Sequence, residues 1–380
     1  MQPNEAMNSA LYQVKRSAIR EFSNLAKKTP GCVALTLGEP DFDTPEPICQ
    51  AVSYAFSQHE THYIENSGSF ALRERIAAFE AEKNGMDYTP EEVIVTSGAT
   101  EALFVSFFGI LNPGDEVIVP TPAFVLYEEI IRLCRGVVVP LDTTGEGFQI
   151  DPDRLRDKIT EKTKAILLNT PNNPTGCVYT KESLQAVYDA VAGKPIFVLC
   201  DDVYRQLIYT EDYHSFSEFR ALRKQILVIQ SFSKPYAMTG WRMGYLLADR
   251  TVIERLALLH QYLVVSTPAP FQRACIAALE CDVTPLLDTY RRRRQYVLQR
   301  LQAMGLHLQP PQGAFYVFPS IAPYRIPSGE FCRRMIREAG LAVTPGFCFG
   351  SDQHIRLTYC YGDEALKEGL DRLAAFLQTL

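Results

Sequence analysis

Lys234 is the residue whose type and position most directly suggest chemistry. It ends the segment Ser231–Lys234, which follows an apolar run at Ile226–Gln230, and Arg242 stands eight residues further on. A lysine amine at the end of a buried strand can attack an aldehyde when it is partly desolvated or close to another cation. A lysine after a strand is most often a surface lysine, so the prediction of a reactive amine depends on the Ser, Gly and Arg residues around it.

A second segment, Thr96–Thr100, has the composition of an anion site. It joins an apolar strand at Val93–Val95 to a predicted helix through small residues. Small residues at a helix N-terminus expose backbone N–H groups, and the helix dipole favours an anion there. Ser231, Ser233 and Arg242 could complete a phosphate cup, with arginine as the forked donor. The alternative is an ordinary strand-to-helix N-cap.

The loop Asn169–Gly176, with the sequence Asn-Thr-Pro-Asn-Asn-Pro-Thr-Gly, follows another apolar strand. Its two prolines and its glycine restrict the backbone tightly. An asparagine amide held in such a loop can donate to a ring oxygen or to a carboxylate. A plain turn is the default explanation, but a turn rarely needs eight such residues, and the length favours a binding loop.

The pair Asp201-Asp202 follows the apolar run Ile196–Cys200, and Tyr204 comes three residues after Asp201. A carboxylate at the end of a buried strand needs a cationic partner or strong donors. A protonated pyridine nitrogen would meet that need, and Tyr204 could reach a hydroxyl group on the same ring. The alternative is a structural ion pair with an arginine.

Arg356 lies within a short apolar run, Ile355–Tyr359. A lone arginine in a buried strand is costly unless its charge is paired. The planar guanidinium suits bidentate capture of a substrate carboxylate. A buried salt bridge explains the residue equally well, and the sequence leaves both interpretations open.

The elements that must position these residues alternate between strands and helices. The predicted strands are Val93–Thr96, Glu116–Val119, Val137–Pro140, Ala165–Leu168, Ile196–Cys200 and Leu227–Gln230. The helical patterns between them lie near Glu101–Leu111, Val125–Leu133, Arg154–Ile159 and Lys181–Val191. Such alternation predicts an α/β fold with a mostly parallel sheet that helices cover on both faces. Active sites of these sheets lie at the carboxyl ends of the strands, where the residues above are found.

The pattern changes after about residue 285. A long charged helix is predicted from near Leu287, and short strands are predicted at Ala314–Phe318, Leu341–Val343 and Ile355–Tyr359. This part of the chain indicates a smaller α+β domain, against which the N-terminal segment could pack. We therefore predict a large domain at 46–285 and a small domain formed by 1–45 and 286–380.

Composition limits the possible functions. The chain has 380 residues and a formal net charge of −6, which gives no general attraction to nucleic acid or to anionic membranes. No apolar run is long enough to span a membrane, and the first ten residues have no apolar core of a signal peptide. Ten cysteines occur without metal-ligand spacing, which predicts reduced thiols and no metal site. The expected protein is a cytoplasmic enzyme.

Taken together, the order and spacing of these motifs resemble the class I/II aminotransferases of the aspartate aminotransferase superfamily, the pyridoxal-5′-phosphate (PLP) enzymes of fold type I. The most specific segments are Ser231–Lys234 followed by Ala237–Arg242, and Asn169–Gly176. The likeness begins at Leu37-Gly38-Glu39-Pro40-Asp41-Phe42 and includes Tyr63–Arg73. The fold that it implies has a mostly parallel seven-stranded sheet between helices and a smaller α+β domain.

By that resemblance, Lys234 is the lysine that forms a Schiff base with PLP, and Asp201 is the partner of the pyridine nitrogen. The resemblance also implies that Tyr204 and Asn173 bind the ring hydroxyl, that the backbone of Ala99 and Thr100 with Ser231 and Arg242 binds the phosphate, and that Phe124 stacks on the ring. Gly38, Asn173 and Arg356 would hold the substrate carboxylate.

The resemblance also implies a partner and a reaction. Family members are dimers with shared active sites, and Tyr63 would reach the phosphate bound by the neighbouring subunit. The implied reaction moves an amino group between an L-amino acid and a 2-oxo acid, such as 2-oxoglutarate, by a ping-pong mechanism. The donor can be aromatic, aliphatic or dicarboxylic. Lys234 would move the proton, and the electron sink would be PLP.

Two other functions are compatible with parts of the pattern. A carbon–sulfur β-lyase or a cyclopropane-carboxylate synthase shares the fold and the lysine, but those lyases usually lack the Gly-Trp-Arg that ends here at Arg242. A PLP-sensing transcriptional regulator would need an N-terminal DNA-binding module, and the cofactor-domain pattern already begins by about residue 36. The arginine run Arg291–Arg294 would point in all directions on a helix, which favours a salt-bridged surface over DNA contact.

The substrate side chain is less well determined by the sequence. Phe124, Phe347 and Phe349 fall in segments near the predicted site, which favours an apolar or aromatic amino acid. These rings can equally be core packing. A distal carboxylate would need a second cation, and Arg16 and Arg20 are candidates through fold analogy.

Overall fold

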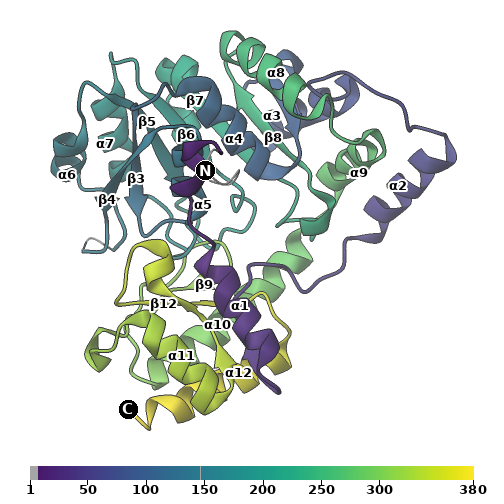
Figure 1. Ribbon diagram of the computed structural model, residues 1–380. Coiled ribbons are helices and arrows are strands. Elements are labelled where there is room, and N and C mark those ends of the chain that lie inside the picture. The colour runs from purple at the N-terminus through teal and green to yellow at the C-terminus, as the bar shows by residue number, and fades with distance from the viewer. Residues whose placement is uncertain (1–6, 146) are drawn as a thin grey trace.

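The computed structural model describes residues 7–145 and 147–380 (Figure 1). Its helices are α1 (Ala18–Lys28), α2 (Glu46–Ser57), α3 (Phe70–Asn84), α4 (Gly98–Ile110), α5 (Leu126–Leu133), α6 (Pro152–Lys158), α7 (Lys181–Val191), α8 (Arg250–Val264), α9 (Ala269–Glu280), α10 (Thr284–Ala303), α11 (Ser328–Ala339) and α12 (Asp363–Leu377). Its strands are β1 (Val33–Ala34), β2 (Val93–Thr96), β3 (Glu116–Thr121), β4 (Val137–Asp142), β5 (Thr163–Asn169), β6 (Phe197–Asp201), β7 (Ile226–Ser231), β8 (Gly244–Ala248), β9 (Tyr316–Val317), β10 (Leu341–Ala342), β11 (Thr344–Pro345) and β12 (Ile355–Thr358).

The central sheet has seven strands in the order β2-β8-β7-β6-β5-β3-β4. Neighbouring strands from β7 to β4 run parallel, and β8 is antiparallel to both β7 and β2. The predicted mostly parallel seven-stranded sheet is therefore confirmed, and each of the six strands derived from the apolar runs is present. The seventh strand, β8, is not among the strands predicted from the sequence.

Helices cover both faces of this sheet, and the strand residues alternate between the two layers. Val93 and Val95 face one core with α3, α7 and α9, whereas Ile94 faces the other core with α4, α5 and α8. The same alternation continues across the sheet, because successive side chains of a strand point to opposite faces. The near-continuous apolar runs in the sequence reflect this burial on both sides.

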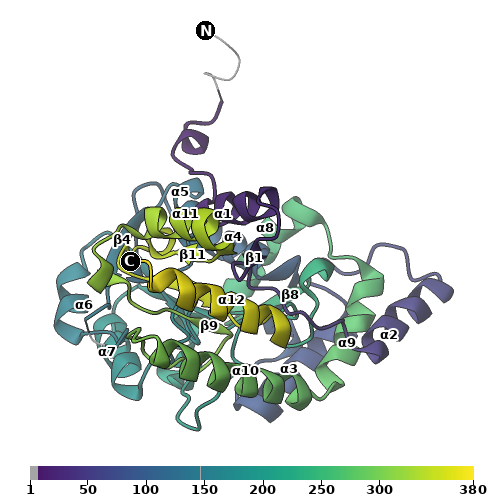
Figure 2. The ribbon, with the colours of Figure 1, turned by 90° about the horizontal axis from the view of Figure 1, so that it is seen from below.

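A further core lies in the part of the molecule that contains α10, α11 and α12. It gathers residues from the beginning of the chain, such as Phe22 and Leu35, with residues between Tyr290 and Phe376. β1 pairs with β10 in parallel, and Figures 1 and 2 both show α1 packed among the C-terminal elements. The N-terminal segment therefore packs with the C-terminal part, as expected. The domain boundaries at 46 and 285 remain predictions.

The strand register brings the chemically interesting residues to one edge of the sheet. Asn169 at the end of β5 lies opposite Asp201 at the end of β6, and Asp201 lies opposite Ile229 in β7. The segment that contains Lys234 leaves the end of β7 at the same edge. α4 begins at Gly98, before the predicted Glu101, and so places Ala99 and Thr100 in its first turn. Among the described residues, no helix is long and apolar enough to cross a membrane.

Candidate active site

A cavity of about 1260 Å³ lies between the sheet edge and the C-terminal part of the chain. All but one of the residues predicted from the sequence line it: Lys234, Asp201, Tyr204, Asn173, Gly38, Ala99, Thr100, Phe124, Ser231, Arg242 and Arg356. The exception is Tyr63, which lies outside the cavity with 87% of its surface exposed. One chain therefore assembles the whole predicted set apart from Tyr63.

Lys234 is held at the floor of the cavity by one hydrogen bond. Its Nζ donates to the backbone oxygen of Gly38 at 2.5 Å and lies 5.9 Å from the ring centre of Phe315. Burial lowers the pKa of the Lys234 ammonium to about 8. The neutral amine, which a nucleophile or a base requires, is therefore far more populated near neutral pH than in a free lysine.

The first turn of α4 and Arg242 form an anion-binding corner. Ser97, the N-cap residue, makes no side-chain cap, so backbone N–H groups of the first turn remain available. Gly98 has φ +76°, and a Cβ there would lie 2.5 Å from Nη2 of Arg242. Only glycine allows this approach. Arg242 is held by donation from Nη1 to the oxygen of Thr239 at 2.9 Å, and its guanidinium lies over the helix end.

Asp201 is buried and has a neutral hydrogen-bond donor rather than an ionic partner. Tyr127 donates its hydroxyl to Oδ2 of Asp201 at 2.6 Å, and burial raises the pKa of the Asp201 carboxyl to about 6. The structural ion pair considered from the sequence belongs to the next residue, because Asp202 accepts from Arg205 at 3.2 Å. Among the described residues, Asp201 has no salt bridge to an arginine or lysine, so it remains available to a cation in the cavity.

Tyr204 forms a buried pair with Tyr316, a residue that the sequence analysis did not identify. The two hydroxyl groups lie 2.6 Å apart. A Cβ on Gly38 would lie only 2.0 Å from the hydroxyl of Tyr316, so the position requires a glycine. The glycine thus lets Tyr316 reach Tyr204, and its own carbonyl holds Lys234.

Arg356 is a buried guanidinium without an anion. It is 2% exposed and is sandwiched between the rings of Tyr316 and Phe349, with centroids at 4.6 and 4.8 Å. Its Nη1 donates to Oδ1 of Asn173 at 2.7 Å and its Nη2 to the oxygen of Thr36 at 2.5 Å, but its Nε has no partner. No carboxylate of the described chain forms a salt bridge with it. The described residues therefore contain no buried salt bridge of Arg356, the alternative considered from the sequence.

The loop after β5 positions Asn173 by its own hydrogen bonds. The backbone N–H of Asn173 donates to Oδ1 of Asn169 at 2.8 Å, and Nδ2 of Asn169 donates to the oxygen of Asp201 at 2.8 Å. With Oδ1 of Asn173 bound to Arg356, its amide NH₂ group remains available to the cavity. The loop thus connects the backbone oxygen of Asp201 to the guanidinium of Arg356.

The expected aromatic lining is only partly present. Phe124 lines the cavity, whereas Phe349 lies beneath Arg356 and Phe347 packs against Phe22 at 6.4 Å. Neither Phe347 nor Phe349 contributes to the cavity wall. Instead, the N-terminal segment adds exposed cations to it, and these include Arg16 and Arg20.

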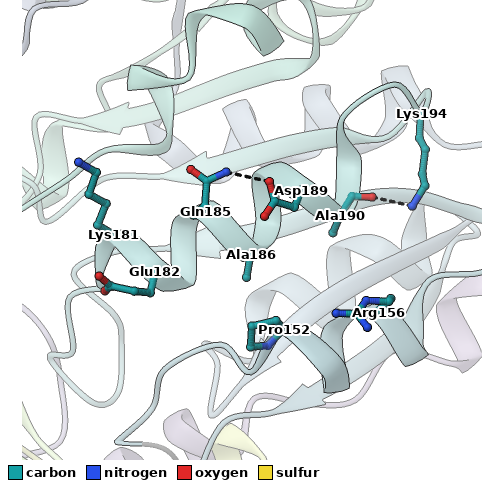
Figure 3. Close-up of a pocket in the computed structure, with 9 residues that line it drawn as sticks. All are labelled: Pro152, Arg156, Lys181, Glu182, Gln185, Ala186, Asp189, Ala190 and Lys194. Carbon is teal, nitrogen blue, oxygen red and sulfur yellow. Dashed lines mark hydrogen bonds between the residues drawn. The ribbon is translucent and has the colours of Figure 1, made fainter.

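A second, smaller groove of about 500 Å³ lies between α6 and α7 and contains none of the predicted residues. Figure 3 shows that its side chains are spread along the helices. Two of them are already bonded within α7 and the residues just after it: Gln185 donates to Asp189, and Lys194 donates to the oxygen of Ala190, both at 2.8 Å. The groove offers no convergent set of functional groups.

Comparisons with known proteins agree with this geometry. Residues 30–373 match the family described as aminotransferase class I and II. The aspartate/prephenate aminotransferase of Thermus thermophilus is 41% identical over 352 residues, which are 91% of each chain. Aromatic-amino-acid aminotransferase 2 of Thermococcus litoralis is 35% identical over 98% of each chain. The solved structure of the Thermus thermophilus aspartate aminotransferase with maleate is 37% identical and has a TM-score of 0.93, covering 99% of this chain and 100% of that one.

Proposed function

The chain belongs to the class I and II aminotransferase family and is a PLP-dependent aminotransferase, and from this premise we propose the roles of its residues, its substrate class and its assembly. In our proposal, Lys234 carries the cofactor and Asp201 faces the pyridine nitrogen. Tyr204 and Asn173 face the ring hydroxyl, and Phe124 lies against the ring. The first turn of α4, with Ser231 and Arg242, receives the phosphate.

The unpaired groups of the cavity fit this cofactor. The uncapped first turn of α4 and the guanidinium of Arg242 suit a phosphate dianion. The buried carboxylate of Asp201 has no cationic partner in the described part of the chain, and a pyridinium nitrogen would supply one. Lys234 has the lowered pKa that an amine needs to react with an aldehyde. Each of these features is costly in an empty cavity and is balanced by a complementary group of PLP.

The chain's own residues then orient the substrate and move protons. PLP supplies an electron sink for the pair of electrons that remains when the substrate Cα loses its proton. Lys234 takes that proton as a base. It then acts as an acid of moderate pKa and returns the proton to the carbon on the other side of the amino nitrogen. Arg356 and Asn173 hold the carboxylate and thereby decide which Cα bond Lys234 faces. Tyr127 keeps Asp201 ionised by donating to it.

The observation that carries this proposal is the buried, unpaired guanidinium of Arg356. A charge at 2% exposure with a free Nε requires an anion that the described chain does not provide. A substrate α-carboxylate satisfies it in bidentate geometry. We expect Arg356→Lys to raise the KM for every amino acid and 2-oxo acid at least about tenfold, because lysine cannot form the fork. An unchanged KM for all substrates would contradict the assignment.

We propose that one substrate of the pair is dicarboxylic, with 2-oxoglutarate as the acceptor. Arg16 and Arg20 line the same cavity as Arg356, and neither has an acidic partner among the described residues. The Thermus thermophilus relative was solved with maleate, which is itself a dicarboxylate. The wall formed by Phe124 leaves room for an aromatic or aliphatic donor in the other half-reaction. The enzyme would thus accept both side-chain classes.

A substrate panel tests this idea. Twenty amino acids would be assayed with 2-oxoglutarate, oxaloacetate and pyruvate in the wild type, in Arg16→Ala and in Arg20→Ala. We expect at least one of the two variants to raise the KM for 2-oxoglutarate about tenfold and to leave that for pyruvate unchanged, since a charge-assisted contact contributes about 1.5 kcal/mol or more. Arg156→Ala, an exposed cation of the second groove, is the matched control. Equal effects on both acceptors would refute a distal-carboxylate role.

We propose that the protein is a homodimer with shared sites. Exposed large apolar side chains are concentrated on α2, α3, α4 and α8 and in the segments beside them: Tyr54, Phe56, Tyr63, Phe70, Phe108, Leu258, Tyr262, Leu263 and Val265. Exposed apolar side chains that gather on one face are typical of a subunit interface, and in our proposal these residues lie in it. Figure 2 shows the short 3₁₀-helix Ser9–Tyr12, which precedes α1, standing away from the body, and its Leu11 and Tyr12 are exposed as well. Tyr63 would then contact the phosphate held by the partner.

Complementation tests the shared sites. Lys234→Ala and Tyr63→Ala chains, each impaired alone, would be mixed and refolded together. If Tyr63 serves the partner's site, a mixed dimer contains one site with both residues intact, and activity returns. A wild-type protein that is active as a strict monomer would contradict this proposal.

We also propose a cytoplasmic location. The ten cysteines are all unpaired, as is usual for proteins of a reducing compartment. Fractionation of cells that produce the protein, followed by immunoblotting, would test this.

A further inference from the structure

His260 is a buried histidine that has no part in the proposed reaction, yet both of its ring nitrogens are engaged. It lies on α8 with no exposed surface. One nitrogen, Nε2, lies 3.0 Å from the backbone oxygen of Asn66, and the other, Nδ1, lies 2.9 Å from Oε1 of Glu101. A carbonyl oxygen can only accept, so Nε2 of His260 donates to Asn66. His260 therefore links the backbone of Asn66 to the side chain of Glu101.

Glu101 connects His260 to the phosphate cup. It follows Ala99 and Thr100 in the first turn of α4, and its Oε2 accepts from the backbone N–H of Ser97. The carboxylate therefore fixes the peptide at which the chain turns from β2 into the helix.

Asn66 connects His260 to the segment that carries Tyr63. Nδ2 of Asn66 donates to the backbone oxygen of Ala257 on α8 at 2.8 Å, so α8 holds this residue by both its side chain and its backbone. Tyr63 stands three residues earlier and is 87% exposed. Tyr63 therefore belongs to the segment between α2 and α3 that Asn66 ties to α8.

We infer that His260 is a positioning residue that sets two cofactor contacts at once: the phosphate cup of its own chain, through Glu101, and Tyr63, which the chain offers to its partner, through Asn66. The second half of this inference rests on the proposed homodimer. His260 is the side chain that contacts both Glu101 and Asn66, so its removal disturbs PLP binding at both sites of the dimer. Through it, the position of α8 is transmitted to both phosphates.

The test uses heterodimers in which one chain carries Lys234→Ala, so that only one site gives the visible band of covalently held PLP. His260→Gln is placed either in the chain with intact Lys234, where it affects the cup, or in the Lys234→Ala chain, where it affects the Tyr63 contact. We expect each placement to raise the Kd for PLP about threefold or more, and the homodimeric variant to raise it about tenfold or more. Losing a hydrogen bond to a charged group has at least an effect of this size. His307→Gln, an exposed histidine of the C-terminal part, is the control without effect.

A double-mutant cycle separates positioning from general damage to the fold. In the Lys234→Ala chain, His260→Gln should add nothing once Tyr63→Phe is present, whereas a general lesion would add its own effect. If Tyr63→Phe weakens PLP binding but His260→Gln leaves the Kd for PLP unchanged in either placement, the inference about His260 is wrong, while the shared-site proposal stands. If Tyr63→Phe itself has no effect, the shared-site proposal fails and the Tyr63 half of the inference fails with it, while the cup half is still decided by the first placement. Glu101→Gln replaces His260→Gln if the latter does not fold, with the same expected weakening in the first placement.

Discussion

Lys234 imposes a cost on the cofactor-free fold that can be measured as stability. Burial lowers its pKa from the ordinary 10.5 to about 8, which means that the folded state disfavours the ammonium form. A difference of this size corresponds to about 3 kcal/mol. Water in the cavity screens part of it, so we expect Lys234→Met to stabilise the apoprotein by about 1 to 3 kcal/mol at pH 7.

The stability difference between Lys234→Met and the wild type should depend on pH in a definite direction. Below pH 8 the ammonium is charged in both the folded and the unfolded chain, and the full cost is present. Between pH 8 and 10.5 the unfolded chain binds more protons than the folded one, so the stability of the wild type rises with pH relative to the variant. Above pH 10.5 the amine is neutral in both states. The advantage of Lys234→Met should therefore disappear across this interval.

Urea unfolding of the apoproteins at pH 7, 8, 9 and 10 measures the effect. Comparing the two proteins at each pH cancels the titration of all other groups that the substitution does not touch. Lys158→Met changes an exposed lysine of α6 and should show neither the gain nor its loss. A Lys234→Met apoprotein that is less stable than the wild type at pH 7, or a gain that stays constant to pH 10, would refute the reasoning.

Two further predictions follow from contacts of the same cavity. Gly38→Ala should lower kcat/KM by an order of magnitude or more, because the new Cβ would meet the Tyr316 hydroxyl at 2.0 Å; steady-state assays with saturating PLP check this, and unaltered kinetics would contradict it. Tyr127→Phe removes a donor that lowers the pKa of Asp201, so the pKa should rise above about 6 and the acid limb of the kcat–pH profile should move to higher pH. An acid limb that stays in place would show that Asp201 does not control it.

The fold followed from the sequence wherever burial on both faces produced uninterrupted apolar runs. β5 and β7 are such strands, and their predicted positions are within two residues of the observed ones at each end. β8 was not predicted because no α-helix separates Gly244–Ala248 from the Lys234 segment. The connection contains only a short 3₁₀-helix at Thr239–Trp241, so the alternation of strands and helices did not mark it. The antiparallel pairing of β8 with β7 and β2 is a long-range choice that local pattern does not encode.

The site residues at the ends of the sheet strands could be predicted from the sequence, whereas those that enter the cavity from other elements could not. Asp201 and Lys234 follow buried strands directly, so their place at the carboxyl edge could be derived from the sequence. Tyr127 and Tyr316 reach the same cavity from a helix and from the C-terminal part, and nothing in their local sequence marks the partners they meet. The same limit applies to Phe349. Its segment lies near the site, but its ring packs against the Arg356 guanidinium and does not line the cavity.

These contacts explain why the cavity is built from charges that the chain itself leaves unbalanced. Among residues 7–145 and 147–380, Arg356 has no carboxylate partner and Asp201 has no cationic partner, and Lys234 is held with a depressed pKa. Each imbalance lowers the stability of the empty fold, and each is removed by a different part of the ligands, namely the substrate carboxylate, the pyridine nitrogen and the aldehyde. A ligand that binds only the folded state therefore recovers this free energy as affinity. Pairing any of these groups inside the protein would stabilise the chain and weaken binding, so the unpaired state is itself a requirement of the function.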